Sequence, residues 1–371
     1  MLLQSLKLTN LLSFGPESPA VELGPLNVLI GPNGSGKSNF LDALALLKAA
    51  PADLTVPIRT GGGIDAWLWK GGARPVTATL EARLPSGEGD VTLAYRLAFA
   101  ETGQRFEVVD ERLDNSGGFL TPPVIDTYFT YDQQGTPWLN TRSEGGPRLR
   151  AIERQSLNPQ QSILSQRRDP DLYPQLTRVS ELFGGLRVYR EFCFGRASAP
   201  RRPQRPDLPN DFLAEDGHNL SLVLNRLLRD ATVKRRLIEL LHLLFEGIED
   251  VGTSLEGGSA QVYLVERSAT IPATRLSDGT LRYLCLLAIL CHPQPPPLVC
   301  IEEPELGLHP DLLPSIVDLL RDASQRMQLV VTTHSDVIVD ALTGTPEAVL
   351  VCEKDEGGTT LRRLDQSDLA G

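Results

Sequence analysis

The glycine-rich segment at residues 31–38, GPNGSGKS, restricts the fold of this chain more than any other feature. It fits the pattern G-x-x-x-x-G-K-[ST] and lies between an apolar run at residues 26–30 and a Leu- and Ala-rich segment at residues 39–49. These flanks predict a buried strand followed by a helix, the context in which this pattern binds phosphate groups. Glycines allow backbone N–H groups to curl around phosphate oxygens, and the helix start adds a favourable dipole. The segment therefore predicts an α/β fold with a phosphate loop.

The positions of this loop have distinct expected roles. We expect Lys37 to reach the β- and γ-phosphates and to assist catalysis, and the Ser38 hydroxyl to ligate Mg²⁺. The expected cofactors are therefore ATP and Mg²⁺. An ordinary glycine-rich turn before a helix is the alternative, but such a turn would not need every fixed position of the pattern. The predicted nucleotide-binding residues here are Asn33, Gly34, Ser35, Gly36, Lys37, Ser38 and Asn39.

A second feature is an apolar run that ends in two carboxylates, LVCIEE at residues 298–303. A buried strand that delivers acids to its carboxyl end suits a magnesium–nucleotide site. We expect Glu302 to hold the metal and Glu303 to act as the catalytic base on the attacking water. A solvent-exposed acidic turn is the alternative, and the phosphate loop earlier in the chain favours the catalytic interpretation.

Two further segments are expected to contact phosphate. The sequence LSDGT at residues 276–280 precedes a predicted helix, so Ser277 and the Gly279 N–H face an anion at the helix start. The sequence VVTTHS at residues 330–335 predicts a buried strand that ends at His334, expected to hydrogen-bond a γ-phosphate during catalysis. The alternatives are a simple helix cap at Ser277 and an ordinary surface histidine at His334.

In chain order, the phosphate loop, L-S-x-G-x, h-h-h-h-E-E-P and T-H-S resemble the ATP-binding cassette superfamily. The chain looks most like the RecF/SMC-like AAA family of bacterial ATPases, and residues 6–14, 215–220 and 301–310 also carry this resemblance. The implied fold class is α/β, a P-loop NTPase with an ABC/SMC-type head, an inserted antiparallel β-sheet and a mainly helical second lobe. Alternating stretches at residues 76–130 predict that inserted sheet.

The resemblance implies that the chain divides into three consecutive parts, which belong to two lobes. Residues 1–165 form the N-terminal part of ATPase lobe I, with the phosphate loop and the antiparallel sheet. Residues 166–289 form the mainly helical lobe II, which carries the LSDGT signature. Residues 290–371 return to lobe I with the acidic strand end and the switch histidine.

In such proteins two heads sandwich two ATP molecules, so the resemblance implies an ATP-dependent homodimer that hydrolyses ATP to ADP and phosphate. Ser277 and Gly279 would then cap the nucleotide held by the partner. His309 stands where relatives place an Asp, and is expected to touch the partner as well.

Relatives also have a glutamine that reaches Mg²⁺ where the lobes meet. Gln161 is the preferred candidate, and Gln160 and Gln166 are the alternatives. Two positions depart from the common pattern: Glu302 replaces an Asp, and Asp278 replaces a Gly in the signature. The second change is expected to add negative charge near the phosphate site.

The charge distribution bears on the partner. The chain has 36 basic and 47 acidic residues, a net charge of −11, which argues against an obvious nucleic-acid binder. Residues 141–205, however, hold 13 Arg, no Lys and 6 acids, a local charge of +7. We expect this window to contact DNA phosphates, in repair or phage defence, with internal ion pairs as the alternative. The other candidate function is a regulatory ATPase that gates a separate effector protein. The long inserted sheet argues against a transporter motor.

The expected location is the cytoplasm, without membrane contact. The five cysteines are scattered, without a C-x-x-C pair, which predicts reduced thiols. The longest apolar run, at residues 283–291, is too short to span a bilayer. The first residues lack the pattern of a secretion signal.

Overall fold

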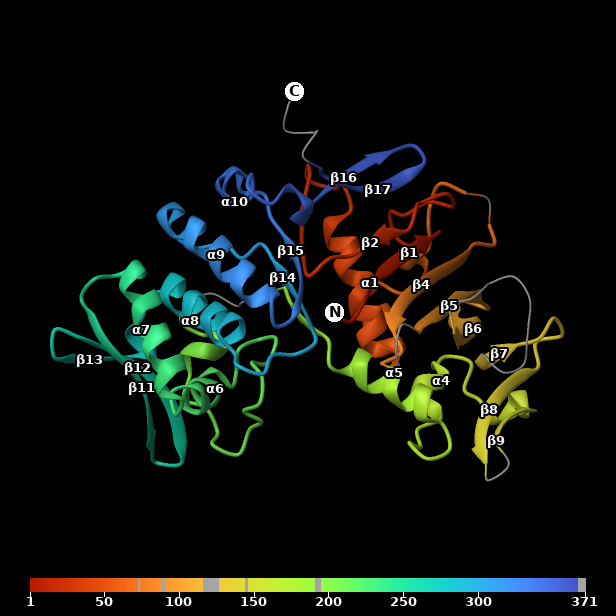
Figure 1. Ribbon diagram of the computed structural model, residues 1–371, viewed down its shortest axis with the longest axis horizontal. Helices are drawn as coiled ribbons and strands as arrows, with labels where there is room; N and C mark the ends of the chain where they lie inside the picture. Colours follow the sequence, from red (N-terminus) through yellow and green to blue (C-terminus); the bar gives the residue numbers. More distant parts are fainter. Residues whose placement is uncertain (73, 88–90, 116–126, 144–145, 191–194, 366–371) are drawn as a thin grey trace. The chain divides into compact units, whose positions relative to one another are not determined.

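The computed structural model describes residues 1–371 except 73, 88–90, 116–126, 144–145, 191–194 and 366–371. Its described residues form two compact units (Figure 1). The first comprises Met1–Leu186 and Leu350–Asp365, and the second has Arg187–Val349 as its described part. The lobe boundaries expected at 165/166 and 289/290 stay a prediction.

The first unit contains an eight-stranded antiparallel sheet in the order β2-β1-β4-β5-β6-β7-β8-β9. The inserted sheet is present as predicted, but its inner strand β5 (Thr92–Thr102) buries consecutive residues, 93–95 and 97–99, and not alternate ones. The strands are β1 (Ser5–Thr9), β2 (Val21–Glu22), β4 (Thr77–Pro85), β5 (Thr92–Thr102), β6 (Arg105–Asn115), β7 (Thr127–Tyr131), β8 (Pro137–Ser143) and β9 (Gly146–Ala151).

The phosphate loop of the first unit lies between β3 (Leu26–Ile30) and α1 (Lys37–Ala49), close to the predicted strand and helix. Helix α1 is held by its fully buried leucines and Phe40, and it contacts α2 and α5. The remaining elements of this unit are α2 (Thr55–Thr60), α3 (Ile64–Trp67), α4 (Ile163–Gln166), α5 (Pro174–Gly184), β16 (Val349–Asp355) and β17 (Gly358–Arg363). Strands β16 and β17 form an antiparallel hairpin.

The second unit has a parallel set of three strands, β10 (Arg187–Tyr189), β14 (Leu298–Glu302) and β15 (Gln328–Thr332). Strands β14 and β15 are almost fully buried, which explains why their sequences are continuous apolar runs. Helix α9 (Leu313–Ser324) packs on β15 and α10 (Asp336–Ala341) on α9.

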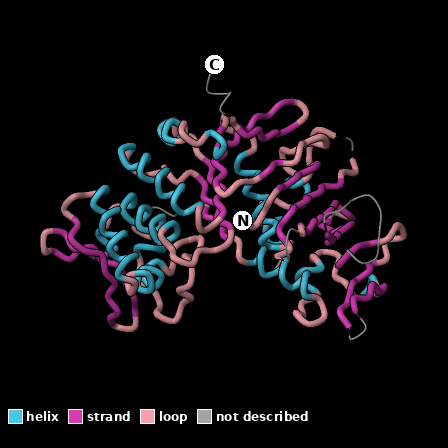
Figure 2. The backbone as a smooth tube through the Cα atoms, viewed as in Figure 1, coloured by secondary structure: helices cyan, strands magenta, loops and turns pink. Residues whose placement is uncertain are grey.

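The same unit contains the expected helices α6 (Leu220–Leu227), α7 (Ala231–Leu244) and α8 (Asp278–Leu290). They accompany a three-stranded antiparallel sheet of β11 (Ile248–Glu256), β12 (Ser259–Glu266) and β13 (Ala269–Pro272). Figure 2 shows the sheet in magenta beside α6 and α7, and both helices contact β11.

Four cysteines are free thiols: Cys285, Cys300 and Cys352 are buried and Cys291 is half-buried, while Cys193 lies outside the described residues. Within the described part of the chain, no helix is both long and apolar enough to cross a membrane.

Candidate functional site

The phosphate loop has the geometry of an anion cradle. The Gly36 backbone has φ 112° at the start of α1, and no side chain caps the first N–H groups of that helix. A Cβ at Gly31 would lie 2.2 Å from the Cys352 carbonyl oxygen, so only glycine fits there. Ser35 Oγ is buried without a hydrogen-bond partner in the described structure. The absence of a side-chain cap at this helix start and the Ser35 hydroxyl suit a phosphate group at this position.

Lys37 lies over the same loop. Its side chain is 5 % exposed, and Nζ donates to the carbonyl oxygens of Gly31, at 2.7 Å, and Pro32, at 3.1 Å. The ammonium is therefore held at the mouth of the cradle by weak acceptors that a phosphate oxygen can replace. Ser38 is exposed in the first turn of α1, as a magnesium ligand at this position must be.

The loop is supported from behind by residues that the sequence analysis missed. Thr359 on β17 is fully buried, and its Oγ1 donates to the Ser35 carbonyl at 2.8 Å. The same hydroxyl lies 2.7 Å from Ser13 Oγ, which also accepts from Asn39 Nδ2 at 2.8 Å. Cys352 Sγ is 3.3 Å from the Ser35 carbonyl oxygen, and burial raises the pKa of this thiol. Asn39 thus has a supporting contact inside the protein.

The structure does not bring Gln161 to Ser38. Gln161 Nε2 donates to Asp53 Oδ1 at 2.7 Å, and its Oε1 accepts from Leu54 N at 3.3 Å. Asp53 follows the C-terminal end of α1, whereas Ser38 is in its first turn. At 1.5 Å per residue, the two ends of α1 lie roughly 15–20 Å apart. The metal role of Gln161 stays a prediction without support from this arrangement.

The two alternative glutamines are also hydrogen-bonded within the chain. Gln160 Nε2 donates to the Phe106 carbonyl at 3.2 Å. Gln166 Oε1 accepts from Asn158 N at 2.7 Å, and its Nε2 donates to nearby carbonyls, including that of Gln161 at 3.0 Å. All three glutamines therefore have local partners that a magnesium site would have to replace.

In the second unit, β14 ends at the two candidate carboxylates. Glu302 is in register with Thr332 on the parallel strand β15. Glu303 then turns the chain with φ 46°, a left-handed conformation uncommon outside glycine. Its N–H donates to the Thr332 carbonyl at 3.0 Å, which fixes this turn. Such backbone strain is often found where a side chain must be aimed for function.

His334 and Glu303, two candidate residues from separate segments of the sequence, lie close together at the ends of these strands. His334 Nε2 is 3.5 Å from Glu303 Oε1, and both side chains are partly exposed. Glu305 holds the histidine segment, because its Oε1 accepts from His334 N at 2.8 Å and from Thr333 Oγ1 at 2.6 Å. Glu305 was not predicted as a functional residue from the sequence, although it lies in the motif that follows β14.

Arg282 is a buried residue of α8 that also supports the turn at Glu303. It is 2 % exposed, and Nη2 donates to the Glu303 carbonyl and, at 3.5 Å, to the Glu302 carbonyl. Loss of hydration lowers the pKa of this guanidinium. The helix that starts at the signature therefore holds the backbone of the candidate base.

The signature segment caps α8. Ser277 Oγ accepts from Thr280 N at 3.0 Å, so this side chain serves as a helix cap in the isolated chain. Gly279 packs against the loop after β14, since a Cβ there would lie 2.6 Å from the Gly307 carbonyl oxygen. His309 in that loop is exposed and accepts from Asp311 N at 3.3 Å.

Asp278 does not leave an uncompensated charge at the signature. Its Oδ1 pairs with Arg201 Nη2 at 2.5 Å, and its Oδ2 accepts from Gly195 N at 2.9 Å. The hydrogen bond from Arg201 is the main reason that the pKa of this carboxyl lies below its ordinary value. Arg201 also donates to the carbonyls of Ala273 and Leu276, which ties the start of α8 in place.

The arginine-rich window is divided between internal and exposed roles. Arg201 is buried, and Arg154 bonds to the Gly135 carbonyl, in agreement with the internal alternative. Arg142, Arg148 and Arg150 are exposed on β8 and β9, the last two strands of the antiparallel sheet. Arg142 also lines a cavity of about 310 Å³; the other lining residues are Tyr128, Asn140, Pro147, Leu172, Tyr173, Pro174, Gln175 and Leu176.

Residues 26–340 match the family described as "AAA domain, putative AbiEii toxin, Type IV TA system". The chain belongs to this AAA-domain family. The match spans the phosphate loop, the signature, both candidate carboxylates and the switch histidine. None of the curated proteins compared matches this sequence.

Solved structures show which fold this AAA-domain chain has. An Smc head bound to the C-winged helix domain of ScpA is 13% identical, with a TM-score of 0.59 and complete coverage of both chains. The Smc head domain with an extended coiled coil from Pyrococcus furiosus is 11% identical, with a TM-score of 0.56, covering 100% of this chain and 98% of that one. The resemblance to RecF/SMC-like ATPases and the P-loop fold class are thereby confirmed.

Proposed function

We propose that this chain binds ATP with Mg²⁺ and hydrolyses it to ADP and phosphate. The observation that carries the proposal is the cradle at residues 31–38, where glycine geometry, an uncapped helix start and the unpartnered Ser35 Oγ converge. Its open N–H groups would hold the phosphates, and Lys37 would exchange its two carbonyl acceptors for phosphate oxygens.

The metal would be held mainly through the nucleotide. No group of three or more His, Cys, Asp or Glu side chains is placed to hold a metal within the described ranges. Mg²⁺ commonly uses one or two protein ligands together with substrate phosphates and water, and Ser38 and Glu302 would serve here. When bound, the ion would neutralise charge that develops on the phosphates.

Glu303 is the proposed base. Its carboxylate would accept the proton of the attacking water, and His334, 3.5 Å from that carboxylate, would orient the water and hydrogen-bond the γ-phosphate. Arg282 and the Thr332 carbonyl would keep the turn at Glu303 fixed during this step.

The decisive test compares three proteins by equilibrium ATP binding and phosphate release. Lys37→Ala should lose ATP binding, because the cradle loses its only ammonium. Glu303→Gln should bind ATP normally, stall in hydrolysis and accumulate as a dimer with ATP on mass measurement in solution. Hydrolysis by Glu303→Gln at the wild-type rate would show that another group is the base.

We further propose that ATP closes a homodimer, with Ser277 and Gly279 acting on the nucleotide of the partner copy, and that the dimer acts on DNA in repair or phage defence. The exposed arginines of β8 and β9 support the DNA role, since guanidinium groups at a sheet edge suit phosphate contacts. Duplex and single-stranded DNA should bind in a salt-dependent way in the presence of non-hydrolysable ATP. Absence of binding at low salt would exclude this role.

The second candidate is a regulatory ATPase that gates a separate effector protein in the cytoplasm. The family description, which names a putative toxin of a Type IV toxin–antitoxin system, favours a protein partner. A stable partner with catalytic motifs of its own, recovered with Glu303→Gln in ATP but not with Lys37→Ala, would support this candidate over the DNA role.

A further inference from the structure

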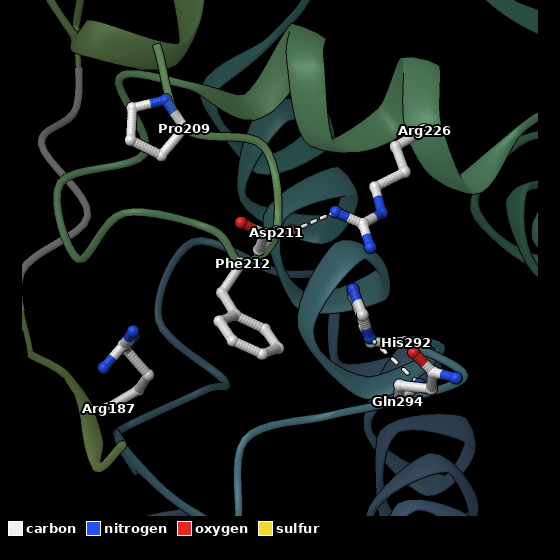
Figure 3. Close-up of a pocket in the computed structure, with 7 residues that line it drawn as sticks. All are labelled: Arg187, Pro209, Asp211, Phe212, Arg226, His292 and Gln294. Carbon is white, nitrogen blue, oxygen red and sulfur yellow. Dashed lines mark hydrogen bonds and ion pairs between the residues drawn. The ribbon is translucent and has the colours of Figure 1, made fainter. Parts of the chain in front are cut away.

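A second polar cavity lies in the second unit, at the amino ends of the parallel strands. It has a volume of about 380 Å³ (Figure 3); the residues that line it are Arg187, Pro209, Asp211, Phe212, Arg226, His292 and Gln294. Arg187 begins β10 and is in register with Val299 near the start of β14. The cavity is therefore at the opposite end of β14 from Glu302 and Glu303, and no role proposed above uses it.

His292 supplies a buried donor to this cavity. The residue is 5 % exposed, and its Nδ1 accepts from Gln294 N at 3.2 Å. Because Nδ1 accepts, the neutral ring carries its hydrogen on Nε2. That Nε2 is buried and has no hydrogen-bond partner of good geometry in the described part of the chain. The Asp211 backbone lies within reach of the ring, where it favours the protonated form and so opposes the effect of burial on the pKa. Burial lowers the His292 pKa, which keeps the ring neutral.

Arg226 directs further donors to the same place. Its Nη1 is paired with Asp211 and is 3.4 Å from Asn210 Oδ1, whereas Nε and Nη2 have no partner in the described part of the chain. Figure 3 shows the unpaired His292 nitrogen directed toward the Asp211–Arg226 pair. His292 Nε2 and the remaining N–H groups of the exposed Arg226 thus face the same place, and an oxyanion bound there would accept from both.

The remaining wall is flat and apolar. The Phe212 ring lies 5.4 Å from the Arg187 guanidinium and 5.3 Å, between centroids, from the His292 ring. Two guanidinium groups, one carboxylate and a histidine ring line the cavity. Its volume lies within the range of small-ligand pockets. The lining therefore combines an anion-binding end with an aromatic surface.

We propose that this cavity binds a small organic anion, with a carboxylate or phosphate head on His292 and Arg226 and an apolar or aromatic body against Phe212. The position implies an effector rather than a substrate. The cavity is built at the ends of α8 and β14 that are remote from the signature and the candidate carboxylates. An occupant that fixes His292 would stiffen the connection between those two elements.

The test is a calorimetric titration with benzoate, phenyl phosphate, inorganic phosphate and, as the matched cation, benzylamine. Each titration is made with the wild-type chain and with Lys37→Ala, so that binding at the phosphate loop is recognised by its loss. We expect saturable binding of benzoate or phenyl phosphate in both proteins, weaker binding of inorganic phosphate, and no binding of benzylamine.

Substitutions then assign the site. Arg226→Met should weaken the anion at least about tenfold, as loss of a charge-assisted contact does, and Arg187→Met should weaken it less. The control is Arg229→Met, an exposed arginine one turn further along, which should bind as the wild type does. The imidazole signals of His292 should shift on saturation.

Either of two results would overturn the proposal. The first is that no anion saturates the chain at concentrations up to about 20 mM, a limit that corresponds to an affinity far weaker than that of ordinary effectors. The second is that Arg226→Met and Arg187→Met bind the anion as the wild type does. The binding measurements do not depend on the proposed ATPase activity. A change in phosphate release caused by the anion does depend on it, and is measured separately.

Discussion

The support behind the phosphate loop makes Thr359→Val the most informative single substitution. Valine keeps the shape of threonine but removes the hydroxyl that donates to the Ser35 carbonyl and contacts Ser13 Oγ. Thr359 is 0 % exposed, so water cannot replace these contacts without opening the fold. Loss of a buried hydrogen bond, with an acceptor left unpaired, costs about 2 kcal/mol. The stability of the first unit should fall by that amount.

The same substitution should weaken nucleotide binding. Because the Ser35 carbonyl would lose its anchor, ordering the loop around a phosphate would cost about 1 kcal/mol more, a roughly fivefold weaker Kd for ATP. Denaturant unfolding and equilibrium ATP titration measure the two effects. The matched control is Thr360→Val on the same strand, whose side chain points to the other face. If Thr359→Val unfolds and binds ATP like that control, the support assigned to β17 is wrong.

Two further predictions concern buried charge. Glu111 is fully buried among Tyr95, Ser162 and the Ile163 N–H, and burial raises its pKa from 4.5 to about 7. The folded state therefore holds a proton that the unfolded state releases. For this group, the free energy of unfolding is highest below pH 4.5 and falls by about 3 kcal/mol as the pH rises to 7. The free energy of unfolding, measured from pH 5 to 8, should show a slope that Glu111→Gln lacks, and equal slopes would contradict the assignment. Arg201→Met should release Asp278 and the carbonyls around the signature, destabilising the chain by about 2 kcal/mol and reducing ATP-driven dimerisation more than ATP binding. Arg202→Met, at an exposed neighbouring position, is its control, and comparable dimerisation of the two variants would refute the role of Arg201.

The parts of the fold that the sequence predicted well are those with local signals. Strand β3, helix α1, and strands β14 and β15 are marked by apolar runs and by a motif whose spacing is fixed, and the structure places them within a residue or two of the prediction. The proximity of Glu303 and His334 was not predicted, although it is consistent with parallel strands that end at one edge of a sheet.

The parts that were missed depend on distant contacts. Thr359 reaches the Ser35 carbonyl across 324 positions of sequence, and nothing in the polar run around it marks that role. Strands β11 and β13 were missed because their exposed faces interrupt the apolar alternation. Gln161 was selected for its place near a lobe boundary, whereas its actual partner, Asp53, could be found only from the three-dimensional arrangement.

The contact between Gly279 and the Gly307 carbonyl changes how a substitution at Gly279 must be interpreted. A larger residue at Gly279 is the obvious substitution for testing whether the signature acts on the nucleotide of a partner copy. In this chain even a methyl group would lie 2.6 Å from the Gly307 oxygen, so the loop between β14 and His309 must move to admit it. Gly279→Ala would therefore report a displaced loop within its own protomer, and a loss of activity could not be credited to the partner's nucleotide.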